Sequence, residues 1–331
     1  MNHNGDISLA RQQIHAAAQA GADTVKFQSF SAEKLVVAGT PTAAYQKTNS
    51  GDTDQMAMLR RLELSEPMHR ELAAFADSLG IEFMSTPFDE EAADMLVSLG
   101  VRRIKVPSGE LTNHPLIAHV ARKGLPLIIS TGMATLEEVG DSLAVIERTR
   151  REVGLDGPLA DALTLLHCTS NYPTELEDVN LRAIQTLGST FGVPVGYSDH
   201  TNGILVAVAA AALGAHVVEK HFTTDRTLPG PDHQASIEPR EFAEMVRQIR
   251  AVGRALGDGQ KVPRASELPV RELVRRSIVA ARDIPANRII TADDLALRRP
   301  GHGLPPAEIL NVVGRRARIT LVGGTLVSPG H

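Results

Sequence analysis

Two lysines interrupt otherwise apolar, strand-like runs of the sequence. Lys26 lies in TVKFQSF (24–30) and Lys105 lies in RRIKVPSGE (102–110). A lysine is almost never fully buried without an anionic partner, so the two predict a carboxylate or phosphate ligand at one end of a sheet. Hydroxyls at the same level are available as further donors: Ser85, Thr86, Ser108, Ser130, Thr131, Ser170 and Ser198. The alternative is a pair of internal ion pairs, with Glu110 as a partner.

Two histidines occupy the ends of the last two strand-like runs. His200 ends VPVGYSDH (193–200), and His221 lies near the end of HVVEKHFT (216–223). Adjacent strands would bring both imidazoles to the same place. Two histidines with open coordination positions suit a divalent cation that acts as a Lewis acid on a carbonyl oxygen, rather than a closed structural zinc site. Taken singly, each histidine is also consistent with a hydrogen-bonded structural role.

Acidic groups and one cysteine complete the set of reactive side chains. Glu110, Asp199 and Asp232 lie in or beside the same strand ends, where they suit proton transfer or hydrogen bonds to the hydroxyls of a ligand. His167 and Cys168 do not form a nucleophilic pair, because adjacent strand residues point to opposite faces. We therefore interpret Cys168 as a small buried apolar residue.

The elements that must position these residues are short strands that alternate with longer helical stretches. Three further runs are strand-like: IEFMSTPF (81–88), LPLIIST (125–131) and LTLLHCTS (163–170). Each run begins apolar and ends in polar residues, as expected when chemistry takes place at the carboxyl ends of parallel strands. The pattern predicts an α/β fold, namely a TIM-type (β/α)8 barrel.

A closed barrel of this type needs eight strands, and the first one is missing from the pattern. Residues 7–20 have apolar positions at helical spacing and end at Gly21, so residues 2–5 are expected to link a strand to this helix. Either Met1 is an internal methionine of a chain that starts upstream, or the barrel is open at its first position. We expect the upstream start.

The composition changes after residue 257. We predict a catalytic barrel over residues 1–257 and a linker of Gly, Pro and polar residues over 258–274. Residues 275–331 are predicted to form a small β-rich domain, because their short β-type runs are broken by Pro and Gly and include no long amphipathic helix.

The charge and hydropathy patterns exclude several classes of protein. The 34 Lys and Arg against 39 Asp and Glu give a net charge of −5 with both signs interspersed, so we expect neither a nucleic acid nor a membrane partner. The longest apolar stretch, 204–218, is too short and too interrupted to span a membrane. A polar start and a single cysteine predict a cytoplasmic protein. Without a P-loop or GxGxxG motif, no nucleotide cofactor is expected.

Taken together, the motifs resemble those of one enzyme family. The chain contains, in this order, NHNGD, VKFQ, STPFD, IKVPSGE, STGM, HCTSNYPT, GYSDHT, EKHFT and GPDH. This series resembles the sialic acid (N-acetylneuraminate) synthase family, which includes the legionaminate and pseudaminate synthases, over essentially the whole chain. The tail, with SIVAARDI and RRPGHG, resembles the antifreeze-like (SAF) domain of that family.

The resemblance implies a reaction. Phosphoenolpyruvate condenses with an N-acylated amino sugar of the mannosamine type and with water, which gives a nine-carbon 2-keto acid and phosphate. In this reaction C3 of phosphoenolpyruvate attacks the sugar aldehyde, water attacks C2, and phosphate leaves through C–O cleavage.

The resemblance also implies roles for individual residues. His200 and His221 match the ligands of a manganese or magnesium ion. The residues that match the phosphoenolpyruvate site are Lys26, Thr86, Lys105, Ser108, Ser170 and Ser198. Those that match the sugar site are Gln28, Phe88, Glu110, Tyr172, Asp232 and Arg299, and the candidate catalytic residues among them are Glu110, Tyr172 and Asp232. Arg299 matches a tail arginine that reaches into the barrel of the partner subunit in a domain-swapped homodimer.

Three departures from the family pattern bear on the substrate and the fold. A family strand that ends in an acidic residue just before NHNG is absent, and Ser170 stands where neuraminate synthases commonly have asparagine. Arg275 and Arg276 replace an apolar aromatic stretch of those enzymes. The runs YQK (45–47), CTSNYPT and GPDH are more similar to the diacetyllegionaminate branch, so we favour N,N'-diacetyllegionaminate over N-acetylneuraminate as the product.

Two other interpretations stay open. One is a different barrel enzyme that condenses phosphoenolpyruvate with a phosphorylated aldose, although such enzymes lack the SAF tail. The other is an inactive sugar-binding paralogue. Against it, the chain retains Lys26, Lys105, His200 and His221, which a catalytically dead barrel would not need.

Overall fold

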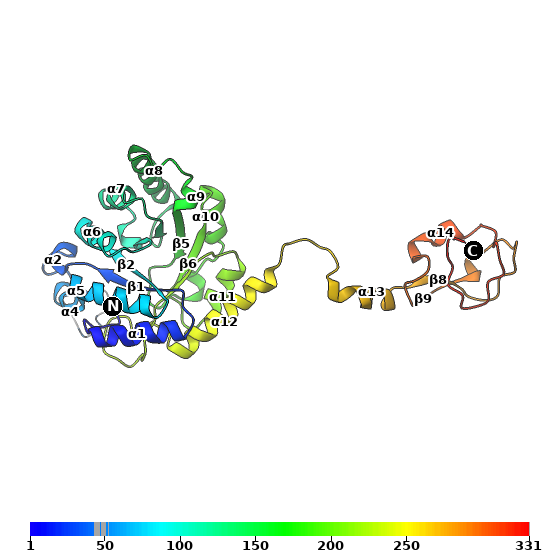
Figure 1. Cartoon of the computed structure of the whole chain (residues 1–331), viewed down its shortest axis with the longest axis horizontal. Coiled ribbons are helices and arrows are strands. Elements are labelled where there is room, and N and C mark those ends of the chain that lie inside the picture. The colour runs from blue at the N-terminus through cyan, green and yellow to red at the C-terminus, as the bar shows by residue number, and fades with distance from the viewer. Residues whose placement is uncertain (43–46, 48–50, 52, 331) are drawn as a thin grey trace. The chain divides into compact units, whose positions relative to one another are not determined.

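The structure is a computed structural model of the chain, and it describes all residues except 43–46, 48–50, 52 and 331. Tyr45 and Gln46 of the YQK run therefore lie outside the described residues. The chain divides into two compact units, Met1–Gly257 and Asp258–His331, and the first holds an inner set of strands surrounded by helices (Figure 1).

The described residues of the first unit contain seven strands. They are β1 (Thr24–Ser29), β2 (Glu82–Pro87), β3 (Ile104–Val106), β4 (Leu127–Ser130), β5 (Leu163–Cys168), β6 (Val195–Asp199) and β7 (Val218–Lys220). β1 pairs with β2, and β3 to β7 pair in sequential order, with every ladder parallel. Each strand lies within one of the seven predicted runs, so the predicted α/β class with a parallel sheet is confirmed.

Helices cover the outside of these strands. The described helices of this unit are α1 (Ile7–Gln19), α2 (Ala32–Leu35), α4 (Gln55–Leu62), α5 (Glu66–Ser78), α6 (Glu90–Ser98), α7 (His114–Arg122), α8 (Leu136–Glu152), α9 (Leu159–Ala162), α10 (Ala183–Phe191), α11 (Leu205–Ala212) and α12 (Pro239–Leu256). Several begin at side-chain caps. The Asp6 carboxylate accepts hydrogen bonds from the first backbone amides of α1, and Thr135 and Glu138 form a capping box at α8.

The hydrophobic core of this unit lies between the strands and the helices. Ile104, Leu127, Ile129 and Leu165 are each at most 1% exposed, and they alternate along their strands with residues that face the other way. β3 ends earlier than predicted because Pro107 has no amide hydrogen for the ladder, and a 3-10 turn over 108–110 follows. The residues that pack against the helices thus determine which residues of each strand face the inside of the half-barrel.

The strands of the first unit form an open half-barrel. No described residue pairs with the free edges of β1 and β7, so the closed eight-stranded barrel predicted from the sequence is not seen in the described part of the chain. A cavity of about 800 Å³ extends between those two edges, where residues 22–25 and 215–218 line it.

The second unit has its own small core. It contains α13 (Leu268–Val274), β8 (Ser277–Ala280), β9 (Leu295–Arg298) and α14 (Ile309–Val312), and β8 pairs with β9 in antiparallel fashion. Its buried apolar residues include Ile278, Ala280, Ile284, Ala317 and Leu321. Part of the predicted linker is helical, because residues 265–274 form a 3-10 turn followed by α13, with a proline in its first turn.

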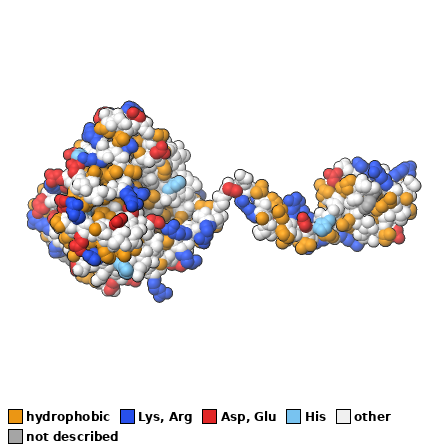
Figure 2. Space-filling view, viewed as in Figure 1, with side chains coloured by type: hydrophobic (Ala, Val, Ile, Leu, Met, Phe, Trp, Pro, Cys, Tyr) orange, Lys and Arg blue, Asp and Glu red, His pale blue; other side chains and the backbone are white. Residues whose placement is uncertain are grey.

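The surface carries charges of both signs. Figure 2 shows Lys and Arg side chains interspersed with Asp and Glu over the visible face of the first unit, as the sequence indicates. Among the described residues, no helix has the length and apolar character needed to cross a membrane.

Candidate active site

The cavity of the first unit collects most of the predicted site residues at the carboxyl ends of the strands. Its lining includes Lys26, Gln28, Phe88, Lys105, Ser108, Tyr172, Ser198, His200, His221 and Asp232. Thr86, Glu110 and Ser170 lie in the same unit but do not line the cavity, and Arg299 is an exposed residue of the second unit. Residues up to 206 positions apart in the sequence therefore meet in one place.

Two lysines and one carboxylate form the charged centre of the cavity. The Lys26 Nζ donates to Glu219 Oε1 at 2.8 Å, and the Lys105 Nζ lies 3.9 Å from Glu219 Oε2. Lys105 also donates to Ser130 Oγ at 2.6 Å and to its neighbour's carbonyl, that of Val106. The protein thus supplies an internal partner for both lysines, and this partner is Glu219 rather than the Glu110 considered from the sequence.

Burial and charge act in opposite directions on these groups. Burial lowers the pKa of Lys105 to about 8, although the negative charge of Glu219 partly opposes the shift. Burial alone would raise the pKa of Glu219, but the charges of Lys105 and Lys26 lower it well below its usual range. One carboxylate between two ammonium groups leaves a net positive charge in a largely buried space, which favours an anionic ligand.

Sequence reasoning missed Glu219. Its signal was the run EKH at the end of β7, where polar residues stand between apolar Val218 and Phe222. Glu110 instead lies in the turn after β3, where it accepts a hydrogen bond from Asn113 at 2.7 Å. Glu110 does not line the cavity, so it is not part of the charged centre.

Small residues and hydroxyls surround the lysines. A Cβ atom on Gly132 would lie 2.3 Å from the Ser170 hydroxyl and 2.6 Å from the Ser108 hydroxyl, so the three residues are in close contact. Cys168 is 2% exposed, as the sequence predicted, and its sulfur lies 3.3 Å from Ser108 Oγ. The buried Thr86 hydroxyl has no hydrogen-bond partner among the described residues. Of the hydroxyls of Thr86, Ser108 and Ser170, that of Ser108 lines the cavity and can donate to a bound anion.

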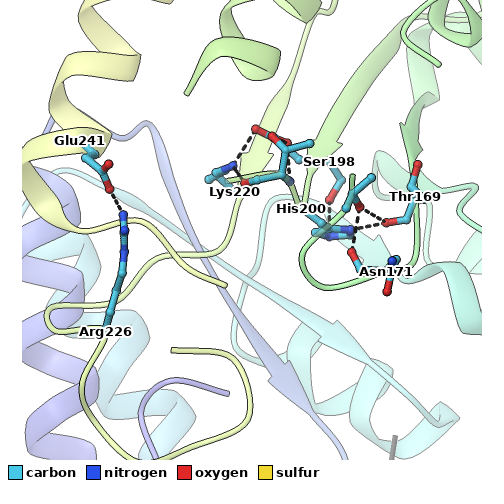
Figure 3. Close-up of polar contacts among 10 residues, drawn as sticks. Thr169, Asn171, Ser198, His200, Lys220, Arg226 and Glu241 are labelled. Atoms are coloured by element: carbon cyan, nitrogen blue, oxygen red, sulfur yellow. Dashed lines mark hydrogen bonds and ion pairs between the residues drawn. The ribbon is translucent and has the colours of Figure 1, made fainter. Parts of the chain in front are cut away.

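His200 and His221 lie side by side, with ring centroids 5.4 Å apart. The Nδ1 of His200 donates to the Thr169 carbonyl at 2.6 Å, which leaves Nε2 as the lone-pair nitrogen, with Ser198 Oγ at a long 3.4 Å (Figure 3). Tyr172 packs against both rings, with centroid distances of 4.2 Å to His200 and 5.4 Å to His221.

The two imidazoles fit a divalent metal ion. Burial lowers the pKa of His200 to about 4 and that of His221 to about 3, so both rings are neutral near pH 7, which is the form that binds a metal. A hydrogen bond from the second ring nitrogen, as His200 makes, is the usual support of a ligating histidine. The described residues contain no cluster of three or more His, Cys, Asp or Glu that could hold a metal. Among the described residues, the fit to a metal therefore rests on the two imidazoles.

Asp232 faces the histidines from the loop after β7. Its Oδ2 lies 3.8 Å from His221 Nδ1, and burial raises the pKa of the carboxyl. The loop is tied to the start of the chain, because Asn2 donates to Ser236 Oγ and Ser236 donates to the Asp232 carbonyl, both at 2.7 Å. The predicted loop at residues 2–5 thus contributes to the position of Asp232.

Asp199 does not belong to the cavity, which corrects the expectation from the sequence. The residue alternates along β6 with Ser198 and His200, so its side chain points to the opposite face of the sheet. There it pairs with Lys220 in a site without solvent exposure.

This geometry defines a class of protein: a half-barrel α/β protein with paired ammonium groups and paired imidazoles at the carboxyl ends of parallel strands. The model of the NeuB family matches residues 13–261, and that of the SAF domain matches residues 275–331. The chain belongs to the NeuB family, and it carries a SAF domain.

Several characterised proteins are similar to this chain along nearly its full length. It is 52% identical to the N,N'-diacetyllegionaminic acid synthase of Legionella pneumophila, covering 100% of this chain and 92% of that protein. The enzyme of the same name from Campylobacter jejuni is 43% identical, over 96% of this chain and 93% of that protein. The crystal structure of the N-acetylneuraminic acid synthetase of Leptospira borgpetersenii, in complex with citrate, superposes with a TM-score of 0.71 at 34% identity, covering 81% of this chain and 86% of that one.

Proposed function

We propose that this protein is a nonulosonic acid synthase. It condenses phosphoenolpyruvate with a six-carbon N-acylated amino sugar and water, and we assign N,N'-diacetyllegionaminate as the product because the two synthases of that name are 52% and 43% identical to it. The observation that carries the proposal is the meeting of Lys26, Lys105, His200 and His221 in one cavity. We expect the reaction to take place in the cytoplasm.

The lysines and hydroxyls would bind phosphoenolpyruvate. Lys26 and Lys105 are placed to pair with its carboxylate and phosphate, and Ser108 and Ser198 line the same space and can donate hydrogen bonds. Glu219 holds the Lys26 ammonium at 2.8 Å before the substrate arrives, which fixes one of the two charges in position. The net positive charge of this group then favours the substrate over water.

The condensation forms one carbon–carbon bond and breaks one carbon–oxygen bond. C3 of phosphoenolpyruvate bonds to the aldehyde carbon of the sugar, and the aldehyde oxygen takes up a proton to become a hydroxyl. Water adds to C2 and gives up a proton, and the C2–O bond to phosphate then breaks to leave the 2-keto acid. Asp232 and Tyr172 line the cavity, and we assign them to holding the sugar and moving these protons.

Two histidines would hold the metal. Manganese or magnesium bound by His200 and His221 would supply Lewis acidity at the aldehyde oxygen. The Thr169 carbonyl keeps the His200 ring oriented, and Tyr172 packs on both rings and limits their rotation. Asp232, at 3.8 Å from His221, is near enough to exchange a proton with a substrate bound at the same place.

We also propose that an eighth strand closes the barrel between β1 and β7. The cavity extends between their free edges, and Ala17 of α1 and Met245 of α12 line it from the outside. A strand in this position would satisfy the unpaired backbone groups of both edges. It would also fill the part of the cavity between the two strand edges and leave open the part at the carboxyl ends of the strands.

A shared active site is the last part of the proposal. We propose a domain-swapped homodimer in which Arg299 of one chain contacts the N-acyl group of the sugar in the barrel of the other. Opposite charge supports this arrangement, since Met1–Gly257 carries 22 Lys and Arg against 32 Asp and Glu, and Asp258–His331 carries 12 against 7.

Substrate selectivity tests the function. Phosphate release from phosphoenolpyruvate is measured with Mn²⁺ and one sugar at a time: the N,N'-diacetylated six-carbon precursor, N-acetylmannosamine, or a phosphorylated pentose. We expect the highest kcat/KM with the diacetylated sugar and a lower value with N-acetylmannosamine. Turnover with the phosphorylated pentose alone would favour the other class of condensing barrel, and no turnover with any sugar would favour the inactive paralogue.

A further inference from the structure

A fully buried ion pair lies on the opposite face of the sheet from the histidines. The Lys220 Nζ is 2.8 Å from Asp199 Oδ2, and both side chains have 0% exposure. Asp199 and Lys220 are direct partners in the β6–β7 ladder. Each immediately precedes one of the two histidines in the sequence.

The pair also makes hydrogen bonds to the backbone of Thr201, the residue after His200. Asp199 Oδ1 accepts from the Thr201 amide at 2.9 Å and from the Thr201 hydroxyl at 2.8 Å, and Lys220 Nζ donates to the Thr201 carbonyl at 2.5 Å. Figure 3 shows Lys220 beside the segment that carries Ser198 and His200. His200 is therefore held between two residues, Asp199 and Thr201, that are bonded to Lys220, the residue before His221.

Stability alone is a weak reason for such a pair. Removing two charges from water is expensive, and a buried ion pair is often no more stabilising than apolar residues of similar volume. The pair does define a geometry, because it ties the ends of two adjacent strands together at the level of the two imidazoles. A geometric role therefore explains the pair better than a contribution to stability.

We propose that Asp199 and Lys220 are positioning residues that hold His200 and His221 at the separation a divalent metal ion requires. The inference rests on the proposed metal site of the proposed function. The two residues act only through the backbone, because their side chains face away from the imidazoles.

The test is the binding of Mn²⁺ alone to the full chain, measured from the free-ion EPR signal without substrates. The double variant D199N/K220M removes both charges and leaves no unpaired one, so folding should survive. We expect its Kd for Mn²⁺ to rise roughly 10- to 100-fold, the usual effect of losing outer support of a ligand. Its affinity for phosphoenolpyruvate without metal should stay within about twofold, because the contacts of Lys26 and Lys105 are untouched.

A matched control removes another charge pair of the first unit. Glu82 and Arg103 pair at 2.8 Å at the other end of the strands, and E82Q/R103M should leave the Kd for Mn²⁺ unchanged. Thr201→Val provides a milder variant that removes one hydroxyl of the network. It should weaken Mn²⁺ binding by roughly threefold to tenfold, as expected for one hydrogen bond, and it decides the matter if the double variant does not fold.

The outcomes separate this inference from the proposed function. Wild-type Mn²⁺ binding that is lost in His221→Ala but unchanged in D199N/K220M would overturn the positioning role and leave the metal site intact. Wild-type binding that His221→Ala does not affect would overturn both, since the pair would then position no ligands. A lower Tm with an unchanged Kd for Mn²⁺ would reduce the pair to a structural role.

Discussion

Among single residues, the site depends most on the buried ammonium group of Lys105. Lys105 is 1% exposed and still makes two hydrogen bonds, to Ser130 and to the Val106 carbonyl. Its ammonium lies too far from Glu219 for a hydrogen bond, at 3.9 Å, whereas Lys26 is within 2.8 Å of that carboxylate. Of the two lysines, Lys105 lies farther from the Glu219 carboxylate, so its charge is more available to a substrate anion.

Replacing Lys105 with Met should raise the Kd for phosphoenolpyruvate roughly 10- to 100-fold, the worth of one charge-assisted contact. The pKa of Lys105 is about 8 in the free site. Wild-type affinity should therefore fall as the pH rises from 7 to 9 and the ammonium loses its proton, while Lys105→Met should lack this decline.

Calorimetric titration at several pH values measures both effects. Lys261→Met, on an exposed lysine of the second unit, serves as the control and should match the wild type. Because the depressed pKa means that the charged lysine costs stability below about pH 8, Lys105→Met should keep its Tm at pH 7. An affinity that stays constant over this pH range in the wild type would contradict the role of Lys105.

The metal prediction belongs to the same scale. His221→Ala should abolish Mn²⁺ binding and lower kcat by at least about 100-fold, because Lewis-acid stabilisation of a transition state is worth several kcal/mol. Chelation of the wild type should have the same effect, with activity restored by added Mn²⁺. His15→Ala, on an exposed face of α1, is the control. Full activity after exhaustive chelation would show that the histidines serve another purpose.

At the scale of elements, strand ends determine which residues can meet. The pattern of the sequence located all seven described strands of the first unit, because each combines an apolar start with a polar end. It also placed Lys26, Lys105, His200 and His221 at the cavity. It grouped Asp199 with Ser198 and His200, although strand alternation places neighbouring residues on opposite faces of the sheet. It could not find Glu219, because its pairing with Lys26 and Lys105 joins strands that are far apart in the sequence.

Close packing at the end of β4 (Leu127–Ser130) gives a prediction at this scale. Gly132→Ala would place a Cβ 2.3 Å from the Ser170 hydroxyl, 2.6 Å from the Ser108 hydroxyl and 2.8 Å from the Ser108 Cβ, so both serines must shift. We expect KM for phosphoenolpyruvate to rise roughly 5- to 30-fold, as for one or two lost hydrogen bonds. Gly157→Ala, where no heavy atom lies within 4 Å, is the matched control. Unchanged kinetics of Gly132→Ala would remove these serines from the substrate site.

At the scale of the whole molecule, the two units differ in charge and in architecture. The first is acidic with a parallel half-barrel, and the second is basic with a small antiparallel β-pair. The sequence separated them at residue 257 by composition, but it did not indicate the helix α13 (Leu268–Val274), because seven residues are too few for a clear helical period. The proposed contact of Arg299 with a partner's barrel depends on assembly, which local sequence patterns do not encode.

Mixed dimers test the proposed shared site. An Arg299→Ala chain co-assembled with a Lys105→Met chain should regain close to half of the wild-type rate per heterodimer. One of the two sites would then combine an intact barrel with an intact arginine. At phosphoenolpyruvate concentrations well below the Kd of Lys105→Met, each parent dimer should be nearly inactive, which the kinetics of the separate variants establish. If the mixed dimers stay as inactive as the parents, each chain uses its own Arg299 and the swap is refuted.

The proposed reaction joins phosphoenolpyruvate to an N-acylated sugar with cleavage of the C–O bond. The most direct test uses phosphoenolpyruvate labelled with ¹⁸O in the oxygen that bridges C2 and phosphorus, together with the N,N'-diacetylated sugar and Mn²⁺. Mass spectrometry of both products should find all of the label in phosphate, in equal amount to an unlabelled nine-carbon 2-keto acid. Label in the keto acid or in pyruvate, or phosphate released at the same rate without sugar, would contradict the account.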